Sequence, residues 1–157
     1  MRLYLKQKVF SFRDKFTLYD ENGHDRYYVE GEVFSFGKKL HIMDTAGNEL
    51  AMIRQRLMTF LPCYSVEIGG ATVAEVVKKF TFFRNEYTIE GLGWTVHGNM
   101  FDHEYEIYSG NQIVAQVRKE WFTFGDAYEI EISPNAHFVT ALAVVLVIDA
   151  CLEQQSD

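Results

Sequence analysis

The chain has 157 residues, of which 48% are hydrophobic and 24% charged, so it is long enough for one domain with a substantial core. Its formal net charge of −7 argues against a nucleic-acid binder, which would carry a basic surface, and weakens adhesion to anionic membranes. We therefore expect a single domain over residues 1–157 and no nucleic-acid partner.

The N-terminal segment and the two cysteines bear on the cellular compartment of the protein. The N-terminal run MRLYLKQKVFSF alternates apolar and charged residues and lacks the apolar core of a signal peptide, which predicts a cytoplasmic protein. Cys63 and Cys151 have no metal-ligand spacing. We interpret both as small buried hydrophobic residues in a reducing compartment.

Most of the chain alternates apolar and polar residues with a period of two, which is typical of strands with one buried face. Tyr64, Val66 and Ile68 illustrate the pattern, with Ser65 and Glu67 between them. Glycine turns separate the segments at Asn22-Gly23, Ala46-Gly47, Gly69-Gly70 and Ser109-Gly110. The pattern predicts about twelve strands. They cover residues 2–11, 16–20, 26–34, 38–43, 49–57, 63–68, 71–80, 85–90, 93–98, 103–109, 112–120 and 127–132.

A short motif recurs through the chain, as VFSF at residues 9–12 and 33–36, LMTFL at 57–61, FTFF at 80–83 and WFTF at 121–124. The longest match aligns residues 51–68 with residues 115–132. Each copy combines two strands and a glycine turn, so the chain is predicted to repeat a two-strand unit. An open sheet of this size would expose two unpaired edges, and closure into a barrel removes them.

The only clear helix follows the last strand. Ser133 is a suitable N-cap residue and Pro134 suits the first helical position, which predicts a helix over residues 134–152. From Phe138 to Ile148 its only polar side chain is Thr140, so every face must be surrounded. A barrel of about twelve strands is too wide for its own side chains to fill. We expect the helix to fill the barrel.

A membrane span is the alternative for this helix. His137 and Asp149 bracket its apolar run, which falls short of the roughly 20 residues that a span requires. We therefore expect no transmembrane span. Asp149 should then reach solvent at the mouth of the barrel, or meet an arginine or backbone donors if it is buried.

The order of these features resembles the LURP-one-related family. The similar segments are Trp94-Thr-Val96-His-Gly98 with Phe101, Tyr105 and Ile107, then Ile113-Val-Ala115-Gln-Val117-Arg118-Lys119, Gly125-Asp126-Ala-Tyr128 and the helix ending Val147-Ile148-Asp149. The resemblance covers nearly the whole chain. It implies a tubby-like fold, a closed antiparallel barrel of twelve strands around a central hydrophobic C-terminal helix. Tubby proteins bind phosphoinositide headgroups through a basic patch, but no tubby lipid-binding motif maps onto positions of this chain.

Candidates for catalysis are weak. His97 and His103 flank Asp102 and Glu104, but Gly98-Asn99 reads as a turn between them, so surface histidines are the favoured interpretation. Cys63 has no sequence cue for a partner base. The sequence also contains no phosphate-binding glycine loop, zinc spacing or nucleophile elbow. We predict no enzymatic activity, no catalytic residues, no metal site and no cofactor.

Basic pairs offer the one candidate binding site. Lys38-Lys39 is such a pair, and three more recur at the ends of equivalent long strands. These are Arg54 and Arg56, Lys78 and Lys79, and Arg118 and Lys119. They either keep strand ends soluble or gather at one rim of the barrel as an anion or headgroup site. We predict a non-enzymatic cytoplasmic binding or scaffold module. The alternative is a peripheral membrane protein that recognises phospholipid or phosphoinositide headgroups through this basic rim, so the partner is an unidentified protein or an anionic lipid headgroup.

Overall fold

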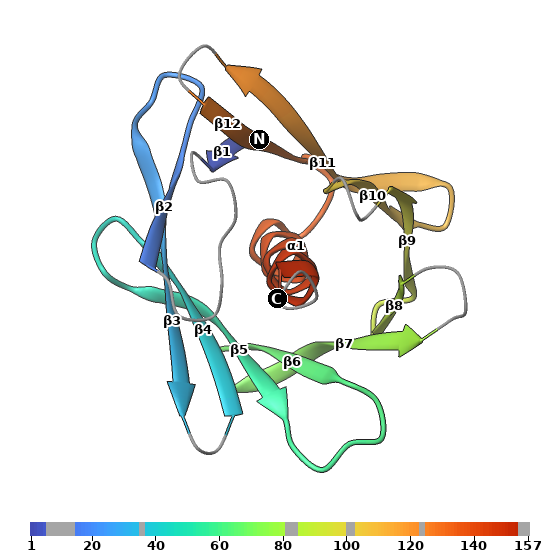
Figure 1. Cartoon of the computed structure of the whole chain (residues 1–157). Coiled ribbons are helices and arrows are strands. Elements are labelled where there is room, and N and C mark those ends of the chain that lie inside the picture. The colour runs from blue at the N-terminus through green and yellow to red at the C-terminus, as the bar shows by residue number, and fades with distance from the viewer. Residues whose placement is uncertain (6–14, 35–36, 81–84, 100–102, 123–124, 154–157) are drawn as a thin grey trace.

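The computed structural model describes residues 1–5, 15–34, 37–80, 85–99, 103–122 and 125–153. They form a closed antiparallel barrel with one α-helix through its centre (Figure 1). The strands are Arg2–Leu5 (β1), Lys15–Tyr19 (β2), Asp25–Phe34 (β3), Gly37–Asp44 (β4), Glu49–Arg56 (β5), Cys63–Ile68 (β6), Ala71–Phe80 (β7), Asn85–Glu90 (β8), Trp94–Asn99 (β9), Glu104–Ser109 (β10), Gln112–Phe122 (β11) and Gly125–Ile132 (β12). The helix is Phe138–Glu153 (α1). The predicted continuation of the first strand to residue 11 lies outside the described residues.

Each strand pairs with its neighbours in the sequence, and the pairing of β1 with β12 closes the barrel. In that seam Leu3 lies opposite Ile130 and Leu5 lies opposite Tyr128. Closure leaves no strand of this sheet with an unpaired edge, which is the physical reason that the sequence argument gave for a barrel. The predicted closed antiparallel barrel of twelve strands is confirmed.

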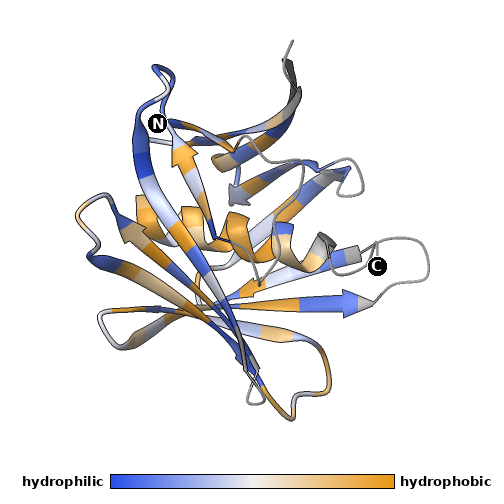
Figure 2. Ribbon diagram, turned by 60° about the vertical axis from the view of Figure 1, so that its left-hand side comes forward, coloured by the Kyte–Doolittle hydropathy of each residue, from blue (hydrophilic) through white to orange (hydrophobic). Residues whose placement is uncertain are grey.

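The period of two in the sequence becomes an inner and an outer face. In β4, for example, Leu40 and Ile42 are fully buried, whereas Lys39 and His41 alternate with them on the outer face. Figure 2 shows strands that alternate between hydrophobic and hydrophilic residues around a helix that is mostly hydrophobic. The buried side chains of strands and helix form one cluster, so the inside of the barrel is a core.

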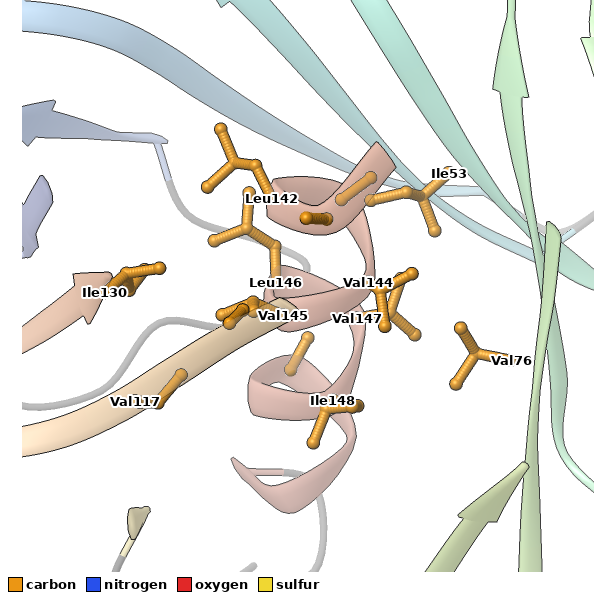
Figure 3. Packing of buried hydrophobic residues seen from close by; sticks show 14 of the residues in the cluster. Ile53, Val76, Val117, Ile130, Leu142, Val144, Val145, Leu146, Val147 and Ile148 are labelled. Atoms are coloured by element: carbon orange, nitrogen blue, oxygen red, sulfur yellow. The ribbon is translucent and has the colours of Figure 1, made fainter. Parts of the chain in front are cut away.

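Helix α1 occupies that core. Its predicted buried residues are confirmed, since all are 0% exposed: Ala141, Leu142, Val144, Val145, Leu146 and Ile148. Side chains from opposite walls face it, including Ile53 and Val76 on one side and Val117 and Ile130 on the other (Figure 3). A helix with no polar stripe is stable here because protein surrounds it on every side.

The helix begins four residues later than predicted, at Phe138. The polar groups of Ser133 close a turn instead, because its Oγ accepts from the Asn135 amide (3.4 Å) and its carbonyl accepts from the Ala136 amide (3.1 Å). The chain needs this turn to leave the barrel wall before the helix can enter the centre. His137 caps the helix, with Nδ1 3.4 Å from the Thr140 amide and 2.8 Å from the Thr140 hydroxyl.

The topology gives the barrel two ends with different contents. We call one end of the barrel the hairpin end. There the chain passes from each odd-numbered strand to the next even-numbered strand, from β1 to β2 through β11 to β12. At the opposite turn end lie the glycine turns and the segment that leads from β12 into α1. The helix therefore begins at the turn end and its C-terminus lies at the hairpin end (Figure 1).

Candidate functional site

The six basic residues of the predicted rim all lie in the half of the barrel nearer the hairpin end, but they face two directions. Arg54 and Arg56 are at the end of β5 and point outward, out of phase with the buried Ala51 and Ile53. Arg54 Nε is 3.2 Å from Glu67 Oε2, and Arg56 Nη2 is 3.1 Å from Glu75 Oε1. Both arginine side chains remain about half exposed, so each pair is a surface ion pair of small energy.

The two lysines of β7 separate from each other. Lys79 is exposed on the outer face, opposite Glu86 in the neighbouring strand. Lys78 shares the inward phase of Ala74 and Val76 and is only 9% exposed. Burial lowers the pKa of Lys78, because the charged ammonium loses solvation, and the nearby Cys151 partly opposes this shift.

The β11 pair divides in the same way. Arg118 is exposed on the outer face and donates from Nη2 to Gln116 Oε1 at 3.1 Å. It lines a hollow of about 410 Å³ over β9, β10 and β11, which His97, Glu104 and Glu106 also line. Lys119 follows the inward phase of Ala115 and Val117 and is half-buried. Since β8, β9 and β10 lie between β7 and β11, the outward cations form separate groups.

The inward lysines share a location that the sequence argument did not foresee. Lys38, in phase with Leu40 and Ile42, and Lys78 both act electrostatically on Cys151 in the last turn of α1. That last turn contains no basic residue of its own. Cations near a helix C-terminus stabilise its partial negative charge, so the barrel wall supplies the charge that the helix lacks. The phase of Lys38 relative to Leu40 was the signal available in the sequence.

The loop between β5 and β6 exposes three large apolar side chains. Met58 and Phe60 are fully exposed and Leu57 is 52% exposed. Figure 1 shows this loop, between the labels β5 and β6, extending away from the barrel wall. These residues belong to a copy of the repeated motif, and their exposure was not predicted from the sequence. Their lack of alternation with polar residues, between two strands that do alternate, was the available signal.

The backbone of this loop is held in an unusual shape. Met58 has φ of 60°, in the left-handed region that residues other than glycine seldom occupy. The loop is attached at its far end, where the Lys78 amide donates to the Pro62 carbonyl at 2.9 Å. At its near end the Thr59 hydroxyl lies 3.5 Å from the Arg56 carbonyl. A Cβ on Gly37 would come within 3.3 Å of Leu57 Cδ2, so Leu57 rests against the start of β4.

Charge is distributed unevenly between the two ends. Among the described residues, every lysine and arginine except Arg2 and Arg26 lies in the half nearer the hairpin end. The turn end carries a set of acidic residues at strand ends and turns: Asp20, Glu21, Asp25, Asp44, Glu49, Glu67, Glu90 and Glu131. Other described acidic residues, among them Glu32, Glu86, Glu104 and Glu106, lie in the same half as the cations, so charge of both signs is present there while the turn end is acidic.

The histidines of the sequence argument do not form a site with each other. The chain reverses between His97 and His103 as expected, but Gly98 and Asn99 belong to β9, so the reversal comes after Asn99 and before β10. Gly98 is required there because a Cβ would lie 2.6 Å from the Glu104 carbonyl oxygen. His97 is exposed and its ring contacts Tyr108, with centroids 5.5 Å apart. Among the residues that the structure describes, no group of three or more His, Cys, Asp or Glu side chains could hold a metal ion. Asp102 lies outside them.

His103 belongs instead to a buried polar cluster at the hairpin end of α1. Asp149 is 3% exposed, and its Oδ1 accepts from the Tyr105 hydroxyl at 3.0 Å and lies 3.4 Å from His103 Nδ1. Tyr105 also lies 3.2 Å from the Val145 carbonyl, and burial first and Asp149 second raise the pKa of its hydroxyl. Of the arrangements left open for Asp149, the buried one is observed, with a tyrosine and a histidine as partners in place of an arginine.

Neither cysteine is arranged as a nucleophile. Both are buried, and neither forms a disulfide. Burial raises the pKa of the Cys63 thiol, and the carboxylate of Glu75 adds to the effect. Burial also raises the pKa of Cys151 to about 12, against the opposing hydrogen bond from Tyr64 and the charges of Lys78 and Lys38. A thiol that resists ionisation is a poor nucleophile and a poor metal ligand.

Comparisons with known proteins agree with this architecture. A model of the LURP-one-related family matches residues 1–149. The chain is 37% identical over 157 residues to a protein of Bacillus subtilis (strain 168) named as uncharacterised protein YxjI, covering all of this chain and 97% of that relative. A protein of Arabidopsis thaliana solved by X-ray crystallography superposes with a TM-score of 0.65 at 18% identity, covering 96% of this chain and 90% of that one. At that identity the likeness shows the fold.

Proposed function

This chain belongs to the LURP-one-related family, and from that premise and from its filled barrel we propose that it is a non-enzymatic binding module. The observation that supports the proposal most directly is the position of α1. Inward side chains of the strands and the fully buried residues of the helix form one hydrophobic cluster, so the volume that a ligand would occupy in a wider barrel is core. Recognition then uses the outer face or one end of the barrel.

The hairpin end is the surface that we assign to recognition. It combines outward cations with the exposed apolar loop, whereas the turn end is acidic. We place the protein in the cytoplasm, where the unbonded Cys63 and Cys151 would stay reduced. Among the described residues no helix is long and apolar enough to cross a bilayer.

A second candidate is the recognition of anionic lipid headgroups at the same end. The observation that favours it is the location of the six predicted rim residues in one half of the barrel. Because Lys78 and Lys119 point inward, the outward set that could meet a headgroup is Arg54, Arg56, Lys79 and Arg118. Each Lys or Arg near an anionic surface contributes on the order of 1 kcal/mol to attraction.

Photo-crosslinking tests the assignment of the hairpin end. A photoreactive residue at Lys79 is expected to capture a specific cellular partner or lipid, and the same residue at Glu90, at the turn end of the neighbouring strand, is expected to capture none. Equal capture at both positions would contradict the assignment.

Liposome co-sedimentation tests the second candidate. A variant that removes charge at Arg54, Arg56, Lys79 and Arg118 is expected to lose salt-sensitive binding to anionic liposomes. It leaves the inward Lys78 and Lys119 in place, so that the charge of Lys78 near Cys151 is not disturbed, and its melting temperature is measured as a control for folding. Wild-type protein that does not sediment with anionic liposomes at low salt would rule this candidate out and leave a protein partner.

A further inference from the structure

We propose that the loop of residues 57–62 is a membrane anchor, whose apolar side chains enter the interface of an anionic bilayer. The inference rests on the proposed recognition of anionic lipid headgroups, and it names the segment that would pass from water into the bilayer. It begins from Phe60, which is 100% exposed, and from Met58 beside it, which is also fully exposed. Two large apolar side chains so close in sequence lose their full contact with water only if a partner covers both.

The shape of the loop favours a bilayer over a protein as that partner. Fully exposed side chains have no neighbouring surface of their own chain beside them, so they form a projection and not a groove or a flat patch. Stable protein interfaces use broad patches of about 800 Å² on each partner. A narrow apolar tip suits insertion of roughly 5–10 Å into the boundary between headgroups and acyl chains.

The backbone holds the tip in place at some energetic cost. Met58 adopts φ of 60°, which is unfavourable for a residue with a side chain. The attachment of Pro62 to Lys78 and of Leu57 to Gly37 keeps both ends of the loop on the barrel rim. The Met58 side chain makes no packing contact that would compensate for this strain, because it is fully exposed. Strained backbone conformations of this kind cluster at functional sites.

Charge around the loop is arranged for an anionic surface. Arg54 and Arg56 lead directly into the loop and keep their side chains about half exposed, and Lys79 is exposed at the end of β7. If Phe60 entered a bilayer, these cations would lie near headgroup level, and Glu86, opposite Lys79, would reduce part of the attraction. The carboxylates of Glu67 and Glu75 reduce the attraction of the two arginines, so the apolar tip is needed to complete binding.

The test compares loop and charge variants on vesicles of phosphatidylcholine with about 30% phosphatidylserine, and on pure phosphatidylcholine. Phe60→Ser and Met58→Gly, singly and together, are expected to weaken binding to the anionic vesicles, by about tenfold for the double variant. Glycine tolerates the left-handed backbone at position 58, so Met58→Gly is expected to keep or raise the melting temperature while binding falls. A fall in binding without a fall in stability separates anchoring from a structural role.

Ile113→Ser is the matched control, because Ile113 is an exposed apolar residue (41%) on β11 near the turn end. It is expected to leave vesicle binding unchanged. In a Phe60→Trp variant, brominated lipids are expected to quench the added fluorescence, which reports entry of position 60 into the bilayer.

The outcomes distinguish the anchor from the proposals on which it rests. If the four-residue charge variant loses binding while the double loop variant binds like wild type, headgroup recognition stands and the anchor is overturned. If wild-type protein binds neither vesicle, the anchor and headgroup recognition both fall, and the module binds something other than lipid. If the loop variants instead dissolve a dimer seen by size-exclusion chromatography, the loop is a contact between copies of the chain and the anchor is overturned.

Discussion

Asp149 is a buried acidic residue whose polar neighbours come from the wall of the barrel and not from its own helix turn. The Tyr105 hydroxyl donates to it at 3.0 Å, and His103 lies 3.4 Å away with φ of 54°. A buried polar group that loses a partner keeps the full cost of its desolvation. The cluster thus ties the end of α1 to β10 by contacts that depend on all three side chains.

Removing one hydroxyl tests this tie. Tyr105→Phe is expected to lower the free energy of unfolding by about 1–3 kcal/mol, because Asp149 loses a donor in a buried site. Denaturant titration measures the change. Tyr108→Phe is the control, since its hydroxyl bonds to Glu106 near the surface, and a change within about 0.5 kcal/mol is expected there. Equal effects of the two substitutions would contradict the buried cluster.

His41 bridges two carboxylates on the outer face of β3, β4 and β5. Nδ1 contacts Glu49 and Nε2 lies 2.9 Å from Glu32. Burial lowers the pKa of His41, but hydrogen bonds and charge from Glu49 and Glu32 together outweigh it, so the pKa is raised above its usual value. Both ring nitrogens can donate only when the imidazole is protonated.

This bridge predicts a pH dependence with a definite sign. Because the folded pKa of His41 is raised, its contribution to stability is complete below the unfolded pKa of about 6.5 and is lost as pH rises through the folded value. His41→Asn should therefore lower the free energy of unfolding more near pH 5.5 than near pH 9, by less than about 1 kcal/mol because the pair is partly exposed. His97→Asn provides a histidine substitution on the outer face for comparison. A larger loss at the higher pH would refute the bridge.

At the scale of elements, α1 and the strands stabilise each other by mutual burial. Residues 141–148 of the helix are fully buried on every face. They form one hydrophobic cluster with the inward-facing side chains of the strands. Helix stability here comes from packing, since the run is rich in β-branched valine, which is not a strong helix former.

A truncation inside the helix measures this packing. Leu146→Ala is expected to lower the free energy of unfolding by about 2–5 kcal/mol, because a fully buried side chain leaves a cavity between wall and helix. Ile113→Ala, at a partly exposed position of β11, is expected to cost much less. Denaturant midpoints at an unchanged m-value would show both effects. A small loss for Leu146→Ala would mean that the barrel relaxes around the helix.

At the scale of the whole molecule, the barrel wall is closed, so the helix can be exposed to solvent only if the barrel opens. The seam between β1 and β12 joins the two ends of the sheet, so the strands cannot part from α1 without breaking a ladder. The two buried cysteines lie in different parts of this structure. Cys151 lies on the helix, and Cys63 begins β6 directly after the exposed loop.

Thiol labelling under native conditions is expected to report that difference. In a Cys63→Ala variant, Cys151 should react only through global unfolding, with an opening free energy equal to that from denaturant titration. In a Cys151→Ala variant, Cys63 should react faster, through opening of the edge beside residues 57–62. Labelling of Cys151 at the rate of Cys63 would show that the end of the helix opens locally.

Local periodicity accounts for how much of the fold was predictable. Leu40 and Ile42 alternate with polar residues because one face of β4 is inside, and that period is visible without knowing the partner strand. The strand bounds agree to within a few residues except at the first strand, whose predicted end is not described. The start of the helix was misplaced because Ser133 and Pro134 suit a turn as well as a helix terminus, and only the position of β12 in the wall decides between them.

The sequence by itself determined a barrel of alternating strands and a helix that must be surrounded, because burial imprints a period of two or an unbroken apolar run on consecutive residues. The recurrence of basic pairs at the ends of equivalent strands also indicated that six basic residues could lie toward one end. Only the tertiary structure decided that Lys78 faces the helix while Arg54 faces Glu67, that Asp149 meets Tyr105, and that Phe60 is left in water. These outcomes depend on pairs of residues far apart in the chain, and no local pattern records which distant side chain will fill a given space.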